Sequence, residues 1–295
     1  MKTIEKLLLP YYAIFLSEET RKKAEFIIVV TAIVSFIIHL LLILLHNQGI
    51  IYAGVNTKLL TNPISAIYTP FSFILLYEVF LLVYYLPQSI SKYIGKQYEI
   101  ITLILIRRIY YDLANLEFTE NWFQVQSDLQ FTYDIIGTLL LFGLIYLFYR
   151  INDSLTKEST LTEGVISFIR IKKMIALFLV PTLLILAIWN LSDWTLSLFE
   201  PSSTIDLSVK NLNTIFYDEF FTILIMIDVL LLLLSFLHTD YFNTVIRNSG
   251  FVISTILIKL SFSTDGLLNT VLMVVAVLFG VVILWMHKQY ERLKR

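Results

Sequence analysis

The sequence predicts an all-α, polytopic integral membrane protein with about eight transmembrane helices, arranged as two parallel-repeat halves of four helices. Three observations lead to this fold class. Of the 295 residues, 57% are hydrophobic and 15% are charged, whereas soluble domains carry about a quarter charged residues. Eight apolar runs approach the length of a membrane span, and basic residues alternate between the loops that separate them. Charged residues also recur in the same order in the two halves of the chain.

Long apolar runs mark the candidate spans, because a helix needs about 20 apolar residues to cross the hydrocarbon layer. Six runs approach or exceed this length, at 26–45, 66–86, 131–149, 174–191, 216–237 and 267–286. Two further runs are weaker. The run at 98–116 contains Arg107 and Arg108, and the run at 250–264 is short and carries Lys259. Six spans would remain if these two runs lay outside the lipid.

Basic residues in the loops test this count, because cytoplasmic loops carry an excess of lysine and arginine. They occur before the first span, in every second loop and after the last span: Lys2, Lys6, Arg21, Lys22, Lys23, Lys92, Lys96, Arg150, Lys157, Arg170, Lys172, Lys173, Arg247, Lys288, Arg292, Lys294 and Arg295. The intervening loops contain Lys58 and Lys210. This alternation favours eight spans, with both termini cytoplasmic in a bacterial-type cytoplasmic membrane. Without the third and seventh runs, consecutive spans would have to run in the same direction.

The N-terminal segment 1–24 mixes an apolar stripe with charged ends. This pattern is typical of an amphipathic helix at the membrane interface, and we expect it to break near Pro10. A docking surface for a partner is the alternative interpretation. We expect no cleaved signal peptide, because the first apolar run is too long for one.

The chain resembles itself at an offset of about half its length, which indicates an internal repeat. Glu78 and Asp228 lie 150 residues apart in similar apolar runs, and Arg107 and Lys259 lie 152 apart. A four-span unit keeps its orientation when duplicated, so the halves would be parallel repeats. The predicted organisation is a first half at 25–150, a cytoplasmic linker at 151–170, a second half at 171–287 and a basic tail at 288–295. Gly143 and Gly280 occupy comparable places in the fourth and eighth spans and are expected to permit close helix approach.

Charged residues inside the spans are the candidate functional residues. A charge near the bilayer midplane costs several kcal/mol unless it is paired or hydrated. The helix rise predicts that Glu78 and Arg107 lie at matching depth on neighbouring helices, and Asp228 and Lys259 likewise. We therefore expect a Glu78–Arg107 pair and an Asp228–Lys259 pair. Arg108 is expected to pair with Asp112, four residues later on the same helix face. These residues either fix helix packing or line an ion or proton path.

Acidic residues predominate at the opposite, outer side. Asp134, Asp218, Glu219 and Asp265 lie at the outer ends of spans, and Asp134 matches Asp265 in the repeat. Such a cluster is a candidate cation-attracting vestibule. The alternative is that outer loops keep acidic residues for solubility.

Several function classes find no support in the sequence. The net charge of -1 favours no nucleic-acid partner, and the chain has no cysteine for disulfides or thiolate chemistry. The four histidines have no zinc-site spacing, and the chain contains no nucleophile elbow or phosphate-binding glycine loop. We therefore expect a non-enzyme with no metal and no cofactor. A membrane hydrolase or lipid transferase with its acids among the outer carboxylates is the enzymatic alternative.

The leading functional hypothesis is a transport protein, either a channel or a carrier, that passes a small ion through or between the halves. The preferred ion is a cation or a proton. The alternative is a non-conducting membrane scaffold that docks a cytoplasmic partner through its basic face. The lipid bilayer is the expected surrounding, and the sequence leaves homo-oligomerisation or a partner subunit open.

Topology gives the first testable prediction. We expect the outer loop that contains Glu120 to be reached only from outside, because the basic residues assign both of its neighbouring loops to the cytoplasm. A Glu120→Cys variant provides a single thiol, since the native chain has none. An impermeant maleimide should label it in intact cells. Inverted vesicles expose the cytoplasmic face instead. Labelling in these vesicles but not in intact cells would contradict the predicted orientation.

Overall fold

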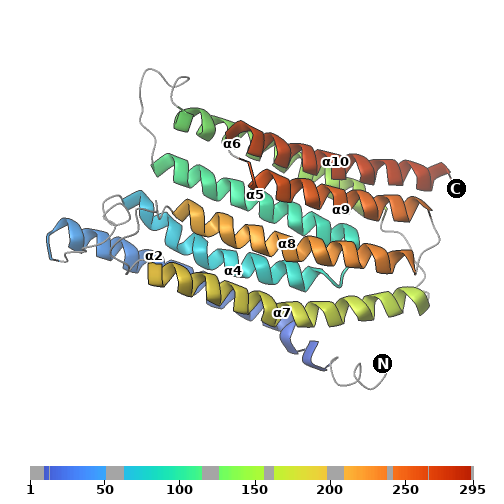
Figure 1. Ribbon diagram of the computed structural model, residues 1–295, viewed down its shortest axis with the longest axis horizontal. Helices are drawn as coiled ribbons and strands as arrows, with labels where there is room; N and C mark the ends of the chain where they lie inside the picture. Colours follow the sequence, from blue (N-terminus) through green and yellow to red (C-terminus); the bar gives the residue numbers. More distant parts are fainter. Residues whose placement is uncertain are drawn as a thin grey trace.

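The chain forms an elongated bundle of long helices that run along one common direction (Figure 1). The computed structural model describes residues 10–12, 14–50, 63–114, 126–155, 163–197, 209–237, 242–264 and 266–293, and these contain helices and connecting turns without strands. The elements are α2 (Glu18–Asn47), the 3₁₀ helix η1 (Pro63–Ile67), α4 (Tyr68–Tyr85), α5 (Ile90–Ala114), α6 (Gln126–Asp153), α7 (Glu163–Ser197), α8 (Val209–Phe236), α9 (Phe242–Phe262) and α10 (Gly266–Leu293).

Five of the described helices are long and apolar enough to cross a membrane: α2, α6, α8, α9 and α10. Helix α4 is apolar but shorter. Each of the eight apolar runs in the sequence falls in a different helix, including the run that contains the two arginines, which lies in α5. The all-helical architecture and the long apolar helices indicate an integral membrane protein.

Local sequence explains where α2 begins. The Ser17 hydroxyl accepts a hydrogen bond from the Thr20 backbone N–H at 3.1 Å, and Glu18 and Glu19 occupy the first turn. An N-cap hydroxyl and acidic residues both stabilise a helix start. The expected break near Pro10 falls at the edge of the described residues. A break that the sequence did not predict lies at Leu16 and Ser17, directly before α2.

Helices extend beyond the apolar runs at the centre and end of the chain. Helix α6 continues to Asp153 and α7 already begins at Glu163. Both ends of the predicted linker 151–170 are therefore helical. Helix α10 also continues beyond residue 287, to Leu293. Polar helix ends extend past the apolar runs because helical hydrogen bonding does not require apolar side chains.

Helix neighbours follow the same order in the two parts of the chain. Helices α2, α4, α5 and α6 pack in succession, and so do α7, α8, α9 and α10. Between these groups, α5 contacts α9, α6 contacts α10, and α4 contacts α7. Figure 1 shows α6 and α10 together at one edge of the bundle, with α2 and α7 at the opposite edge. Helix α5 is therefore interior, with neighbours in both groups.

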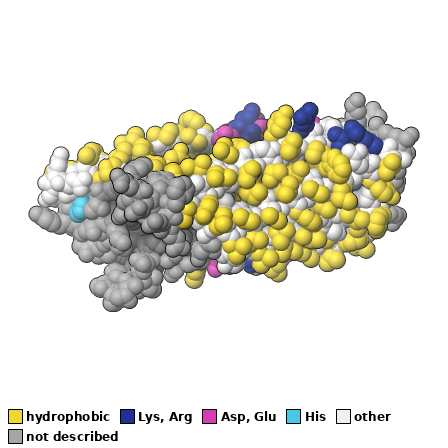
Figure 2. Space-filling view, turned by 90° about the horizontal axis from the view of Figure 1, so that it is seen from above, with side chains coloured by type: hydrophobic (Ala, Val, Ile, Leu, Met, Phe, Trp, Pro, Cys, Tyr) yellow, Lys and Arg dark blue, Asp and Glu magenta, His cyan; other side chains and the backbone are white. Residues whose placement is uncertain are grey.

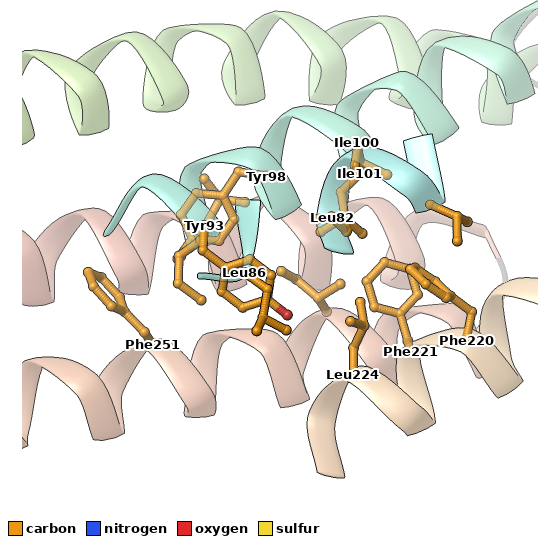
Figure 3. Close-up of a cluster of buried hydrophobic side chains, with 14 of the residues drawn as sticks. Leu82, Leu86, Tyr93, Tyr98, Ile100, Ile101, Phe220, Phe221, Leu224 and Phe251 are labelled. Carbon is orange, nitrogen blue, oxygen red and sulfur yellow. The ribbon is translucent and has the colours of Figure 1, made fainter. Parts of the chain in front are cut away.

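The apolar core draws side chains from α4 to α10, and α4, α5, α8 and α9 contribute many of its large residues. Figure 3 shows large buried side chains from these helices or directly after them, including Leu82, Tyr98, Phe221 and Phe251. The ring of Tyr98 packs edge-on against Phe148 of α6, with centroids 5.2 Å apart. Phe148 in turn packs against Phe251 of α9, with centroids 5.8 Å apart, and this contact joins the first group of helices to the second.

The outer surface of the bundle is strongly apolar. Helix α2 is the clearest case, because Phe26 is 71% exposed and apolar residues are exposed around much of its circumference. Figure 2 shows hydrophobic side chains over most of the described surface seen there, with lysine and arginine towards the end where α10 finishes. An apolar exterior around buried polar residues is the arrangement expected in lipid.

Glycine permits a close helix approach at one of the two expected positions. A Cβ atom at Gly280 would lie 1.7 Å from the Tyr98 hydroxyl oxygen, so α10 approaches α5 only because this side chain is absent. At Gly143 no atom lies within 4 Å of the added Cβ position, and the expected close approach there is wrong. Gly137 of α6 has the role instead, since its Cβ would lie 2.3 Å from Thr270 of α10.

This difference predicts opposite effects of two alanine substitutions. Gly280→Ala should destabilise the bundle by about 1–3 kcal/mol, because the methyl group overpacks against buried Tyr98. Gly143→Ala should be neutral or stabilising, because alanine is the better helix former by about 1 kcal/mol. Thermal unfolding in one detergent measures both. Equal melting temperatures of the two variants would contradict the proposed helix contact.

Candidate functional site

A seam of buried polar side chains crosses the bundle and is organised by α5. We call it the polar seam, and it comprises Glu78, Gln97, Tyr98, Arg107, Arg108, Asp134, Asp228, Ser254, Thr255, Asn269 and Thr270. Four of these residues come from α5, and they contact members on α4, α6, α8, α9 and α10. The polar seam therefore contains hydrogen bonds that connect the two groups of helices.

The predicted Glu78–Arg107 pair is present. Arg107 Nη2 lies 2.9 Å from Glu78 Oε2, and the two side chains are 4% and 3% exposed. The Arg107 guanidinium also lies 5.8 Å from the centre of the Phe71 ring. Because water is excluded from both side chains, each charge is stabilised by the other, and their contact joins α4 to α5.

The expected Arg108–Asp112 pair is wrong, because Arg108 pairs with Asp134 of α6. Its Nε and Nη2 atoms contact the two carboxylate oxygens, with Nη2 at 2.6 Å from Oδ1. This two-point geometry matches the planar guanidinium fork, and such charge-assisted bonds are stronger than neutral ones. Helix α6 lies against α5 and brings a fully buried carboxylate to Arg108.

Helix α10 completes the surroundings of Arg108. Arg108 Nη1 donates to Asn269 at 2.7 Å, and Nη2 donates to the Thr270 hydroxyl at 3.0 Å. That hydroxyl donates to Asp134 Oδ1 at 2.7 Å. The second arginine thus ties α5, α6 and α10 together.

The expected Asp228–Lys259 pair is also wrong. Lys259 donates to Thr222 at 2.5 Å, whereas Asp228 accepts a hydrogen bond from Gln97 at 3.1 Å. Thr222 precedes Asp228 by six residues on α8, which is about 9 Å along the helix axis. Lys259 is therefore directed to a different level of α8. Matching positions in the proposed repeat do not have matching partners here.

Asp228 lies beside a small internal cavity of about 20 Å³. Tyr93, Lys172 and Asn248 also line this cavity, from α5, α7 and α9. Lys172 is 2% exposed, and its ammonium group donates to the Gln88 carbonyl oxygen at 2.6 Å. The Tyr93 hydroxyl is buried beside Gln97 and Asp228.

Gln97 connects Asp228 to α9. Its Nε2 donates to Asp228, and its Oε1 accepts a hydrogen bond from the Thr255 hydroxyl at 3.0 Å. Gln97 was not among the residues predicted from the sequence, and Lys172 was expected in a cytoplasmic loop. A usable signal existed for Gln97, since it precedes Arg108 by 11 residues, or about three helical turns, and so shares its helix face.

The outer acidic candidates do not gather as a vestibule in the described residues. Asp134 is fully buried against Arg108, so its predicted place in an open vestibule is wrong. Glu219 is exposed. The Asp218 side chain and the whole of Asp265 lie outside the described residues.

A larger cavity of about 420 Å³ opens at one end of α2, α4, α5 and α6. Charged and aromatic residues line it, among them Glu18, Arg21, Tyr84, Lys92, Lys96, Glu99, Tyr149 and Asp153. Gln88 lines this cavity too, and its carbonyl oxygen is the acceptor for Lys172. Gln88 therefore borders the open cavity and also contacts Lys172, which lines the Asp228 cavity.

Comparisons of the chain with family models, with curated proteins and with solved structures find no match. Within the described residues, no group of three or more histidine or acidic side chains could hold a metal ion. The fold and the seam define the class: an all-helical integral membrane protein with buried charges on an interior helix.

The Glu78–Arg107 contact predicts a specific double-mutant result. Glu78→Leu and Arg107→Leu should each destabilise the protein by about 3–5 kcal/mol, because each leaves a buried charge without its partner. The double variant should recover much of that loss. Thermal unfolding in detergent of the two single variants and the double variant measures the coupling free energy.

A control cycle pairs Glu78→Leu with Thr182→Val, a change at an exposed position of α7. These effects should be additive. Additive losses in the Glu78 and Arg107 cycle as well would show that the two side chains do not interact. Arg108→Leu should cost as much as Arg107→Leu, since it leaves fully buried Asp134 without its arginine.

Proposed function

We propose that this protein is a membrane transport protein, channel or carrier, that passes a small cation or proton along the polar seam. The observation that carries the proposal is the concentration of buried and half-buried charged side chains on and around one interior helix of an apolar bundle. Placing an ionisable residue within a membrane segment costs free energy, and such residues often mark ion pathways. Arg107, Arg108, Asp134 and Asp228 are all of this kind.

The helix arrangement supports eight spans in two parallel halves. Each apolar run has a helix of its own, and the neighbour order of α2, α4, α5 and α6 recurs in α7, α8, α9 and α10. Corresponding helices meet where α5 contacts α9 and α6 contacts α10. Contacts between corresponding helices are expected of repeats related by an axis along the membrane normal. We place the path at this junction.

The orientation in the proposal has both termini in the cytoplasm. The start of α2 and the end of α10 face the same end of the bundle (Figure 1). Arg21, Lys92 and Lys96 line the cavity of about 420 Å³ at the end of the first four helices. Basic residues on one side of the membrane are typical of a cytoplasmic face. The open cavity then becomes the cytoplasmic entrance.

The proposed route leads from this entrance to Asp228 and then along α5. The hydrogen bond from Lys172 to the Gln88 carbonyl oxygen joins a residue that lines the Asp228 cavity to a residue that lines the entrance. Gln97 and Thr255 follow, and Arg108 with Asp134 lies about three turns further along α5. The narrow cavity at Asp228 has room for about one water molecule. The route therefore favours relay by side chains or alternating access over an open aqueous pore.

A non-conducting scaffold is the second candidate function. The direct ion pairs of Glu78 and Asp134 favour it, because both carboxylates are packed against arginine and buried. Such pairs can serve only to fix the packing of neighbouring helices. In that case the basic cytoplasmic face would dock a partner subunit, and the seam would be purely structural.

Reconstituted flux distinguishes the two candidates. Purified protein in liposomes should pass at least one member of a panel of H⁺, Li⁺, Na⁺ and K⁺ faster than protein-free liposomes. Gln97→Leu should reduce that flux by about tenfold, because it removes a hydrogen bond to a buried charge worth about 1.5–3 kcal/mol. Thr182→Val is the matched control and should retain the flux. Monodisperse protein that passes none of these ions would contradict transport and favour the scaffold.

A further inference from the structure

Asp228 differs from the other carboxylates of the polar seam in the groups that it meets. Glu78 and Asp134 each contact an arginine directly. Because a guanidinium stays protonated, each of these two carboxylates faces a fixed positive charge. Asp228 instead accepts a hydrogen bond from the neutral Gln97 amide and lies beside a cavity large enough for about one water. From this contrast we infer that the transported ion is a proton and that the Asp228 carboxylate binds it, an inference that rests on the proposed transport function.

The groups around Asp228 suit a proton better than a metal cation. Metal cations such as Ca²⁺ and Mg²⁺ take about six or more oxygen ligands. Here an amide N–H donates to the carboxylate, and the cationic residue Lys172 lines the same cavity. Both carry positive charge towards the place that a cation would occupy. A carboxylate that gains a proton becomes neutral and needs no additional oxygen ligands.

Hydrogen bonds around Gln97 can be satisfied in both protonation states of Asp228. In the ionised state, Gln97 Nε2 donates to Asp228 Oδ2, and Thr255 donates to Gln97 Oε1. The Thr255 hydroxyl has a second acceptor already in reach, the Phe251 carbonyl oxygen at 3.1 Å. When Asp228 is protonated, its O–H donates to Gln97 Oε1 after the amide turns over. Gln97 Nε2 then donates to Thr255, and Thr255 donates to Phe251.

This exchange costs no hydrogen bond, because each donor finds an acceptor before and after the proton binds. An unsatisfied buried polar group would cost about 1–3 kcal/mol, and the paired acceptors of Thr255 avoid that penalty. The amide of Gln97 is therefore a two-position element whose orientation follows the charge of Asp228. A change in the charge of Asp228 on α8 therefore changes the hydrogen bonds of α5 and α9, where the two groups of helices meet.

Lys172 supplies the connection to the cytoplasmic entrance. Lys172 lines the Asp228 cavity, its ammonium group donates to the Gln88 carbonyl oxygen, and Gln88 lines the open cavity. The titratable groups that face Asp228 are Tyr93 from α5 and Lys172 from α7, while α9 contributes the non-titrating Thr255 and Asn248. A proton from cytoplasmic water reaches Asp228 through the single-water cavity, forms the O–H bond there and leaves the carboxylate neutral. The buried lysine balances the negative charge when the proton departs.

The test combines proton flux with a direct measurement of carboxyl protonation. Proteoliposomes with an internal pH-sensitive dye and a potassium diffusion potential should acidify, and Asp228→Asn should slow acidification at least tenfold. Glu19→Gln is the matched control, since it makes the same carboxyl-to-amide change at an exposed position of α2. It should leave flux unchanged. Infrared difference spectra between two pH values should show a protonated-carboxyl band that Glu19→Gln retains and Asp228→Asn loses.

A second variant covers the case in which Asp228→Asn does not fold. Thr255→Val keeps the side-chain shape and removes the hydroxyl that pairs with Gln97 in both states, so it should slow proton flux several-fold. Retained proton flux in Asp228→Asn, or in Thr255→Val, would overturn the inference. Flux of Na⁺ or K⁺ without proton flux would overturn it while leaving the transport proposal intact. No flux of any ion would overturn both.

Discussion

An arginine inside an apolar bundle must meet a partner, and this requirement organises the structure around α5. Arg107 and Arg108 are adjacent in sequence and therefore point about 100° apart around the helix. Arg107 pairs with Glu78 on α4, and Arg108 pairs with Asp134 on α6. Two neighbouring charges thus specify two different neighbouring helices. Asn269 and Thr270 extend the second contact to α10, so the same dipeptide also ties the first group of helices to the second.

The two groups of helices use their buried charges differently. In the first group each buried carboxylate of the seam is held by an arginine, which makes α4, α5 and α6 a tightly specified unit. In the second group Asp228 contacts a neutral amide beside a cavity, while Lys259 bonds to Thr222. Two groups of helices with a similar neighbour order therefore surround their buried carboxylates with different partners, arginine in the first group and a neutral amide in the second. The proposed role of Asp228 rests on this asymmetry.

Much of the fold is predictable from the sequence because hydrophobicity is a local property. The eight apolar runs lie in separate helices, and even the arginine-containing run is helical in α5. The Glu78–Arg107 pair was also predictable, since equal depth on consecutive helices leaves few partners for a buried charge. The ends of the helices were less predictable. Helices α6 and α7 extend into the polar linker because backbone hydrogen bonds continue a helix regardless of side-chain polarity.

Composition, apolar run length and the order of charges by themselves determined that this is an all-helical membrane protein with charged residues on interior helices. Tertiary structure alone decided the partners of Arg108, Asp228 and Lys259. Arg108 has Asp112 one turn away in sequence but meets Asp134, because α6 and α10 pack against that face of α5. Asp228 meets Gln97 because α5 lies between the two groups of helices. Such choices depend on the offset and rotation of packed helices, which side-chain fit across the bundle sets and no local stretch of sequence encodes.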